Sequence, residues 1–146
     1  MYIETPGKPI PQPRMRLFYR YGKSIVFDPS TKQKKLVKKI IKDQVDLINL
    51  TKFQYPVINF LFYMPIPIKL RKAAKCSKRA LRHILKPDVD NLIKFYLDCM
   101  NGLVYEDDKT VAIGQAYKIC SESPRTVIQI RESDLMIKPE CFACGF

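Results

Sequence analysis

Acidic side chains gather in one stretch of a chain that is otherwise basic. The stretch begins with Lys86-Pro87-Asp88-Val89-Asp90-Asn91-Leu92-Ile93-Lys94 and continues through Asp98 to Glu106-Asp107-Asp108. A cluster of carboxylates without cysteine or histidine ligands suits hard cations, namely Mg²⁺ or Mn²⁺. Such a metal beside a basic surface that binds phosphates is the layout of a phosphodiester hydrolase, in which the cation polarises the phosphate and activates water. Lys94 would stabilise the developing charge or orient that water.

A predicted helix positions these groups. Apolar side chains from Val89 to Met100 recur at i, i+3, i+4, i+7, i+8 and i+11, which is typical of one buried helix face. The opposite stripe carries Asp90, Asn91, Lys94 and Asp98. Asp88 lies just before the helix, Asn101-Gly102 ends it, and Asp107-Asp108 precedes the next strand. We therefore expect three or four carboxylates to converge beside the lysine.

A purely structural role is open for each of these residues. Asp88 and Asp90 could complement the helix dipole, and Lys94 could pair with the acids one turn away. Asp107 and Asp108 could be turn residues. Spacing alone does not decide between this alternative and a metal site.

The charge balance indicates a polyanionic partner. The chain has 26 Lys and Arg against 14 Asp and Glu, a net charge of +12. Residues 1–87 hold 20 basic and 4 acidic residues, whereas residues 88–146 hold 6 and 10. Nucleic acid is the first candidate and a membrane surface the second, and a merely soluble or ribosome-associated basic protein is the alternative. Our candidates for DNA contacts are Arg14, Arg16, Lys69, Arg71, Lys72, Lys75, Lys78, Arg79, Arg82 and Lys86.

The remaining pattern predicts an α/β (α+β) fold, with a small mixed β-sheet and two main helices packed on it. A chain of 146 residues is the size of one domain, which we place at 1–133 with a C-terminal tail at 134–146. A helix is expected from Ser30 or Thr31 to about Asn49. The expected strands are 1–4, a central strand at 57–64 covered on both faces, and a hairpin of 111–119 with 126–131.

Several classes of protein are disfavoured. No apolar run approaches the roughly 20 residues that span a bilayer, and the N-terminus has no visible secretory signal. Five cysteines, mostly scattered, fit a reducing cytoplasm. Cys141 and Cys144 form a lone C-x-x-C without a second ligand pair, which favours a loose tail over a zinc or redox site.

Three features stay open between alternatives. The lysines at 32–42 could bind DNA or be a solvated helix face. The aromatic residues near Arg14–Arg20 could stack on unpaired bases, although core or interface positions are favoured. His83 lies in a basic loop at 69–86, which we expect to be mobile without DNA, and would be a phosphate contact or a solvated residue.

Taken together, K-P-D-V-D-N-L-I-K at 86–94, D-C-M-N-G at 98–102 and Y-E-D-D at 105–108 resemble the signature of the RusA family of Holliday junction resolvases. Gly7-Lys8-Pro9-Ile10-Pro11 with Arg14 and Arg16 resembles that family's N-terminus, and Phe27-Asp28 fits its pattern. The resemblance covers roughly residues 3–131 and implies a Mg²⁺-dependent endonuclease, with Mn²⁺ as a substitute. It implies a homodimer that cuts four-way or branched DNA with symmetric nicks and leaves 5′-phosphates.

Carried over by position, the resemblance implies catalytic roles for Asp88, Asp90, Lys94 and Asp108. Asp88, Asp90 and Asp108 would hold the metal, with Asp107 as an accessory ligand. No membrane and no small-molecule cofactor is implied, and a DNA-acting enzyme of this kind would work in the cytoplasm on the nucleoid. The alternatives are a catalytically silent binder of branched nucleic acid and a basic scaffold protein. For a dimer interface, the sequence offers the strand at 57–64, the N-terminal segment and the hairpin at 111–131.

Overall fold

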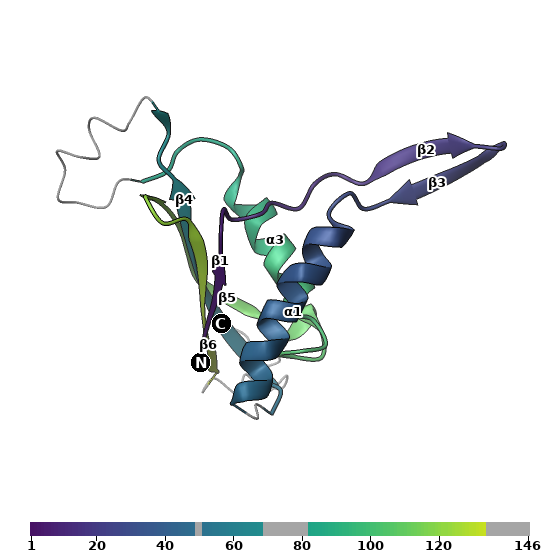
Figure 1. Ribbon diagram of the computed structural model, residues 1–146. Helices are drawn as coiled ribbons and strands as arrows, with labels where there is room; N and C mark the ends of the chain where they lie inside the picture. The colour runs from purple at the N-terminus through teal and green to yellow at the C-terminus, as the bar shows by residue number, and fades with distance from the viewer. Residues whose placement is uncertain (49–50, 69–81, 134–146) are drawn as a thin grey trace, which may run out of the picture.

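The computed structural model describes residues 1–48, 51–68 and 82–133 of the chain. Within them, a four-stranded mixed sheet carries two helices on the same side, and a separate two-stranded hairpin stands off the body (Figure 1). This confirms the predicted α+β class with two main helices. The elements in chain order are β1 (Tyr2–Pro6), β2 (Arg16–Arg20), β3 (Lys23–Phe27), α1 (Thr31–Leu47), β4 (Pro56–Pro65), α3 (Val89–Met100), the 3₁₀ turn η2 (Asp108–Thr110), β5 (Ala112–Ser121) and β6 (Arg125–Glu132).

The strand predicted at the centre of the sheet is central. The sheet order is β1-β6-β4-β5, and β4 pairs parallel with β5 and antiparallel with β6. The prediction that both faces of this strand are covered is wrong. Side chains are fully buried at alternate positions such as Phe60 and Phe62, while those between them are only half-buried. The reason is that α1 and α3 both lie on one face of the sheet (Figure 1).

The predicted hairpin of 111–119 with 126–131 is also wrong. Both segments are strands, but they do not pair with each other because β4 lies between them. The turn at 122–124 therefore connects β5 to β6 across the central strand. Alternation of apolar and polar residues predicts a strand but not its neighbours, and the apolar β4 is the segment that gains most from the central position.

The two helices pack on each other and on the sheet. From α1, Val37, Ile41 and Val45 are buried, whereas the neighbouring Leu36 is 62% exposed. In α3 the buried side is centred on Leu92, Phe95, Tyr96, Cys99 and Met100. Val89, which was predicted to belong to the apolar face of α3, is 37% exposed. The buried face of α3 is therefore rotated about the helix axis relative to the predicted face. As a result Asn91 and Asp98 are half-buried, whereas Asp90 and Lys94 are exposed.

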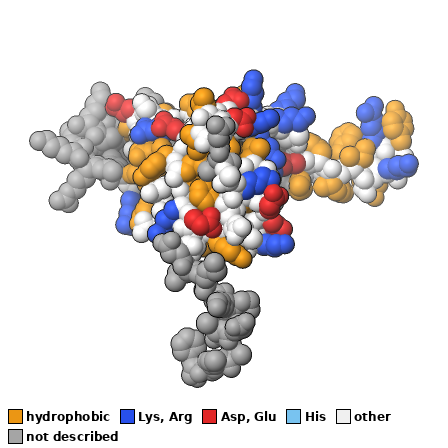
Figure 2. All heavy atoms as spheres, turned by 90° about the horizontal axis from the view of Figure 1, so that it is seen from below, with side chains coloured by type: hydrophobic (Ala, Val, Ile, Leu, Met, Phe, Trp, Pro, Cys, Tyr) orange, Lys and Arg blue, Asp and Glu red, His pale blue; other side chains and the backbone are white. Residues whose placement is uncertain are grey.

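Strands β2 and β3 form a projecting hairpin, which we call the arm (residues 16–27). The turn residues Tyr21 and Gly22 both have positive φ, 51° and 69°, as a two-residue type I′ turn requires. Every strand residue of the arm is exposed, and Figure 2 shows its hydrophobic and basic side chains standing away from the body. Of the favoured core or interface positions for these aromatic residues, the core position is therefore wrong, whereas the interface position stays a prediction.

Two further predictions concern cysteines and membranes. Cys99 and Cys120 are free thiols, and Cys99 is fully buried, which raises its pKa to about 12. Cys76, Cys141, Cys144 and the whole predicted tail lie outside the described residues. Among the helices that are described, none has the length and apolar character needed to cross a membrane.

Candidate functional site

The start of α3 presents the predicted catalytic side chains to solvent. Asp88 is the N-cap residue with extended geometry (φ −70°, ψ 148°), but its carboxylate makes no capping hydrogen bond. Asp88, Asp90 and Lys94 are all exposed, and none forms an ion pair within the described part of the chain. The alternative in which Lys94 pairs with neighbouring acids is thus not observed. Exposed groups without an intramolecular partner are available for a ligand.

A lysine from the sheet fixes the approach to α3. The Nζ of Lys118, on β5, donates to the backbone carbonyls of Leu85 at 2.8 Å and Pro87 at 2.6 Å. The backbone N–H of His83 donates in turn to the backbone carbonyl of Lys118 at 3.0 Å. Asp88 therefore follows directly on a segment that is held to the sheet. These two hydrogen bonds could not be predicted from the sequence, because their acceptors are backbone carbonyls, which every residue has.

His83 differs from both of its predicted roles. Its side chain is buried, with 7% of the residue exposed, rather than solvated. Burial, together with the nearby charge of Lys118, lowers the pKa of His83 and favours the neutral ring. A buried neutral imidazole does not supply a cationic contact to phosphate.

Asp107 and Asp108 occupy the turn that leads into β5. The Asp107 carboxylate accepts a hydrogen bond from the Lys109 N–H at 3.1 Å and forms an ion pair with Lys109 Nζ at 3.2 Å. The backbone N–H of Lys109, followed by its side chain, lowers the pKa of Asp107. Asp107 therefore has the turn-capping role that the structural alternative predicted, while Asp108 is exposed at the first position of η2.

The carboxylates do not form a closed metal-binding group. Over residues 1–48, 51–68 and 82–133, no three Asp, Glu, His or Cys side chains are close enough together to hold one ion. Asp88 and Asp90 lie at the start of α3 and Asp108 on η2, and like charges repel when they approach. The chemistry of the donors nonetheless suits Mg²⁺, because all three offer exposed carboxylate oxygens. Their role as metal ligands stays a prediction.

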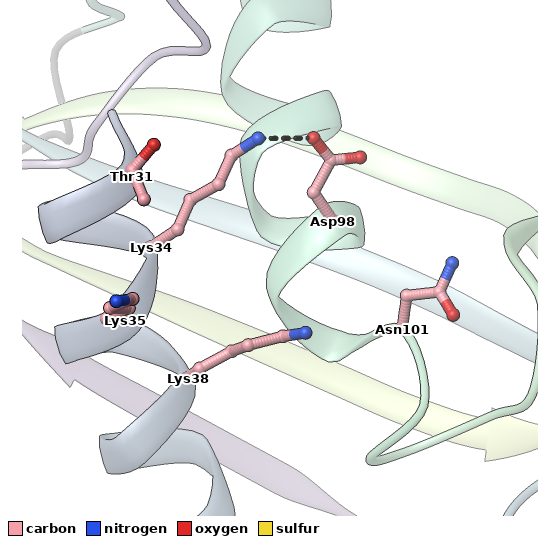
Figure 3. Close-up of a pocket in the computed structure, with 6 residues that line it drawn as sticks. All are labelled: Thr31, Lys34, Lys35, Lys38, Asp98 and Asn101. Carbon is pink, nitrogen blue, oxygen red and sulfur yellow. Dashed lines mark hydrogen bonds and ion pairs between the residues drawn. The ribbon is translucent and has the colours of Figure 1, made fainter. Parts of the chain in front are cut away.

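An ion triad that was not predicted lies beside this region. Lys34 Nζ contacts Asp28 Oδ2 at 2.8 Å and Asp98 Oδ2 at 2.7 Å, the second contact being drawn in Figure 3. Asp28 also accepts from the Ser30 N–H at 2.8 Å, the Ser30 hydroxyl at 2.5 Å and Gln12 Nε2 at 3.1 Å. The triad joins the segment just after β3, the first turn of α1 and the last turn of α3.

The electrostatics of the triad follow from these contacts. The hydrogen bond from Lys34, with those from Ser30, holds the pKa of Asp28 well below its usual range. Partial burial by itself would lower the pKa of Lys34, because it disfavours the charged amine. The carboxylates of Asp28 and Asp98 have the larger combined effect, so the pKa of Lys34 is raised. The one signal in the sequence was the position of Asp28 directly before the expected helix.

Two hollows meet at the triad. One, of about 260 Å³, is lined by Gln12, Pro13, Arg14, Met15, Lys34, Asn91, Lys94 and Asp98. The other, of about 420 Å³, lies between α1 and α3 and is lined by the six residues of Figure 3: Thr31, Lys34, Lys35, Lys38, Asp98 and Asn101. The structure therefore brings predicted catalytic Lys94 and predicted DNA-binding Arg14 to one hollow. The backbone N–H of Gln12 donates to the backbone carbonyl of Asn91 at 2.8 Å. This bond holds the segment before the arm against α3.

The predicted DNA contacts are only partly described. Arg14 and Arg16 are exposed at the base of the arm, and Arg82 and Lys86 are exposed before α3. Lys35 and Lys38 add two exposed cations without an ion pair in the described residues. Lys69, Arg71, Lys72, Lys75, Lys78 and Arg79 lie outside the described residues.

Comparison with known proteins gives a consistent result. Residues 6–131 match the family model described as "Endodeoxyribonuclease RusA". A protein of Bacillus subtilis (strain 168), described as uncharacterized protein YqaN, is 35% identical over 136 residues, which cover 86% of this chain and 92% of that protein. The matched region contains the arm, both helices and the whole acidic stretch. The chain therefore belongs to the RusA family of endodeoxyribonucleases, which are nucleases of the Holliday junction resolvase type.

Proposed function

We propose that this protein is a Mg²⁺-dependent nuclease that resolves four-way DNA junctions by paired symmetric nicks, leaving 5′-phosphates, in DNA recombination and repair. The observation that carries the proposal is that Asp88, Asp90 and Lys94 are exposed and form no ion pair with any described residue, and that Lys94 lines one hollow together with Arg14. Such an enzyme would act in the cytoplasm on the nucleoid.

Each side chain has a role in this proposal. Asp88, Asp90 and Asp108 would hold the cation, which when bound supplies a polarised phosphate and a more acidic water. Lys94 would stabilise negative charge that develops on the phosphoryl oxygens. Arg14 would hold a backbone phosphate, because a guanidinium binds two phosphate oxygens at once.

Two nicks require two such sites. One chain carries one copy of the acidic set, so we propose a homodimer with a two-fold axis that matches the approximate symmetry of the junction. The strand at 57–64 is no longer a candidate for the interface along its edges, because β5 and β6 occupy both of them.

A junction-cutting assay tests the proposal. A synthetic four-way junction and a linear duplex of equal length are incubated with the protein and Mg²⁺, and the strands are separated on a denaturing gel. We expect paired nicks in the junction only, no cutting in excess EDTA, and binding without cutting in Ca²⁺. Ligation of the products without prior kinase treatment would verify the 5′-phosphates. Cutting that persists undiminished in EDTA would contradict metal dependence.

Asparagine variants separate chemistry from binding. Asp88→Asn, Asp90→Asn and Asp108→Asn should each reduce cutting by at least about 100-fold while junction affinity is kept or increased, because a negative charge near phosphate is removed. Asp46→Asn is the matched control, since this exposed acid lies in the last turn of α1. Wild-type cutting by Asp90→Asn would show that the residue assignment is wrong.

Because no three described carboxylates lie close enough together to hold one ion, there is a second candidate function. It is a catalytically silent protein that binds branched nucleic acid on the same fold. That candidate predicts tight junction binding with no nicks in Mg²⁺ or Mn²⁺. It also predicts that the asparagine variants differ from the wild type in affinity alone.

A further inference from the structure

The N-terminal part of α1 carries a block of positive charge that the fold does not neutralise. Residues 30–42 contain six lysines and no Asp or Glu. Of the six, Lys34 alone forms an ion pair within the described residues, and the exposed others are Lys32, Lys35, Lys38, Lys39 and Lys42. Lysines four residues apart repel each other, and cations are unfavourable at the N-terminal end of a helix dipole. Since a solvated helix face usually carries charges of both signs, this block indicates an anionic partner.

Two of the unpaired lysines line the larger of the two hollows. Lys35 and Lys38 belong to its α1 side, and Asn101, the C-cap residue of α3, belongs to its other side. In Figure 3 the side chain of Lys38 extends from α1 toward α3. The hollow has a volume of about 420 Å³. That is many times the roughly 30 Å³ of one water molecule, so a phosphate group with part of its sugar can enter.

The charges that line this hollow leave a net attraction for anions. Asp98 is the one acid among the lining residues, and its Oδ2 lies 2.7 Å from Lys34 Nζ. These two opposite charges offset each other, so the charges of Lys35 and Lys38 remain for a ligand. An ammonium group has three N–H donors and an amide such as that of Asn101 has two, whereas phosphate oxygens only accept. The hollow therefore has the donors and the charge to bind a phosphate.

We propose that Lys35 and Lys38 bind a backbone phosphate of the junction strand next to the phosphate that is cut. Lys34 and Asp98 line both hollows, so a strand that lies along the smaller hollow, with Lys94 and Arg14, continues past them into the larger one. The inference rests on the proposed function for the identity of the anion. An acidic protein segment would offer the same charge, but only DNA is already bound in the neighbouring hollow. Of the two roles open for the lysines at 32–42, these two lysines therefore take DNA binding.

Paired charge variants of α1 test this contact. Lys35→Gln with Lys38→Gln removes the lysines of the hollow, and Lys39→Gln with Lys42→Gln removes two exposed lysines of the same helix that line neither hollow. Junction affinity is measured by fluorescence anisotropy in Ca²⁺. We expect the first pair to weaken binding at least about tenfold, and the second less than about threefold. The slope of log affinity against log salt should become shallower by about 0.9 for each phosphate contact that is lost.

Two further variants separate phosphate binding from a structural role. Lys35→Arg with Lys38→Arg should keep the affinity within about threefold, because arginine also binds phosphate. Far-UV circular dichroism checks each variant, since Lys38 extends toward the C-terminal end of α3, where a cation also stabilises the helix. If the double glutamine variant does not fold, Lys35→Gln alone should still weaken binding at least about threefold. Wild-type affinity of a folded Lys35→Gln variant would overturn the proposal.

A neutral methylphosphonate at single positions of the cut strand locates the phosphate. In the wild type we expect one or two positions beside the nick at which affinity falls about tenfold and which do not depend on Arg14. At those positions the Lys35→Gln, Lys38→Gln variant should lose no further affinity, whereas the Lys39→Gln, Lys42→Gln variant should respond like the wild type. Equal loss of affinity in both variants, or the same response to methylphosphonate in both, would overturn the proposal.

Binding and cutting distinguish this inference from the proposed function. Affinity that depends on Lys35 and Lys38, for a junction that the wild type never cuts in Mg²⁺, would support the phosphate contact and refute the nuclease. Normal cutting, with both pairs of glutamine variants binding equally well, would refute the phosphate contact alone.

Discussion

Replacing Lys34 by methionine should destabilise the fold, although the residue belongs to a helix face rich in exposed lysines. Methionine keeps most of the aliphatic length of the side chain and removes only the charge that holds Asp28 and Asp98. The substitution therefore separates the electrostatic role of Lys34 from its packing.

The magnitude follows from the partial burial of the triad. The side chains of Lys34, Asp28 and Asp98 are 20%, 15% and 34% exposed. Surface ion pairs contribute 0–1 kcal/mol, and removing one member of a fully buried pair costs about 3–5 kcal/mol. Because the triad is half-way between these cases and Asp28 keeps its bonds from Ser30 and Gln12, we expect a loss of about 2 kcal/mol in the free energy of unfolding. That loss corresponds to a Tm lower by roughly 4–8 °C.

The assay is urea unfolding followed by circular dichroism, with Lys35→Met as the control. Lys35 is adjacent, exposed and without an ion pair in the described residues, so its substitution should change stability by less than about 0.5 kcal/mol. A Lys34→Met variant as stable as this control would show that the triad does not contribute to the free energy of unfolding.

The triad also gives the effect of Lys34→Met a dependence on pH. The pKa of Asp28 is lowered in the folded state, so its contribution is fully present above the unfolded-state value of about 4 and is lost as the pH falls below it. The stability difference between wild type and Lys34→Met should therefore be largest near neutral pH and should narrow as the pH falls below about 4. A difference that stayed constant down to pH 2 would contradict the ionic origin of the effect.

Three other expectations concern the segment that leads into α3, the buried core and the net charge. Lys118→Met should reduce single-turnover junction cutting by at least about tenfold at saturating enzyme with affinity unchanged, since it releases the segment before Asp88, whereas Lys109→Met should not. Thr126→Val removes a buried 2.8 Å hydrogen bond to the Tyr96 hydroxyl and should cost about 1–3 kcal/mol in urea unfolding, and a cost below 0.5 kcal/mol would contradict this. Junction affinity, measured by fluorescence anisotropy, should fall on the order of 10³-fold between 50 and 200 mM salt if some six phosphates are contacted, because each chain carries +12, and a flat salt dependence would argue against phosphate binding.

Features encoded by local periodicity could be predicted from the sequence. The helix at 89–100 and the central strand at 57–64 were found because their apolar spacing is set by the element itself. The exposed faces carrying Asp90 and Lys94 followed from the same spacing. The buried side of α3 was misjudged at Val89 and Phe95, because which part of a helix is covered depends on where its neighbours lie.

Features that depend on distant parts of the chain could not be predicted. Asp98 meets Lys34 across 64 residues, and nothing near either one distinguishes that pair from other acids and lysines. The projection of the arm was not predicted because Leu17 and Phe18 have the composition of a buried strand, and only the fold shows that no part of the described body reaches them. For the candidate site, Lys94 and Arg14 could be identified as candidates from the sequence. That the two residues line the same hollow is known only from the structure.

The position of β4 between β5 and β6 has a consequence for how the protein folds. Strands β5 and β6 are joined by a short turn, yet they cannot form a local hairpin first, because β4 must enter between them. Strand β1 pairs with β6 through Tyr2 and Gln129, almost the full length of the described chain apart. The sheet is therefore assembled from long-range pairings, which slows folding relative to sheets made of hairpins. During synthesis both edges of β4 stay unpaired until the last strands emerge, so a chain truncated before β6 should aggregate rather than form a smaller sheet.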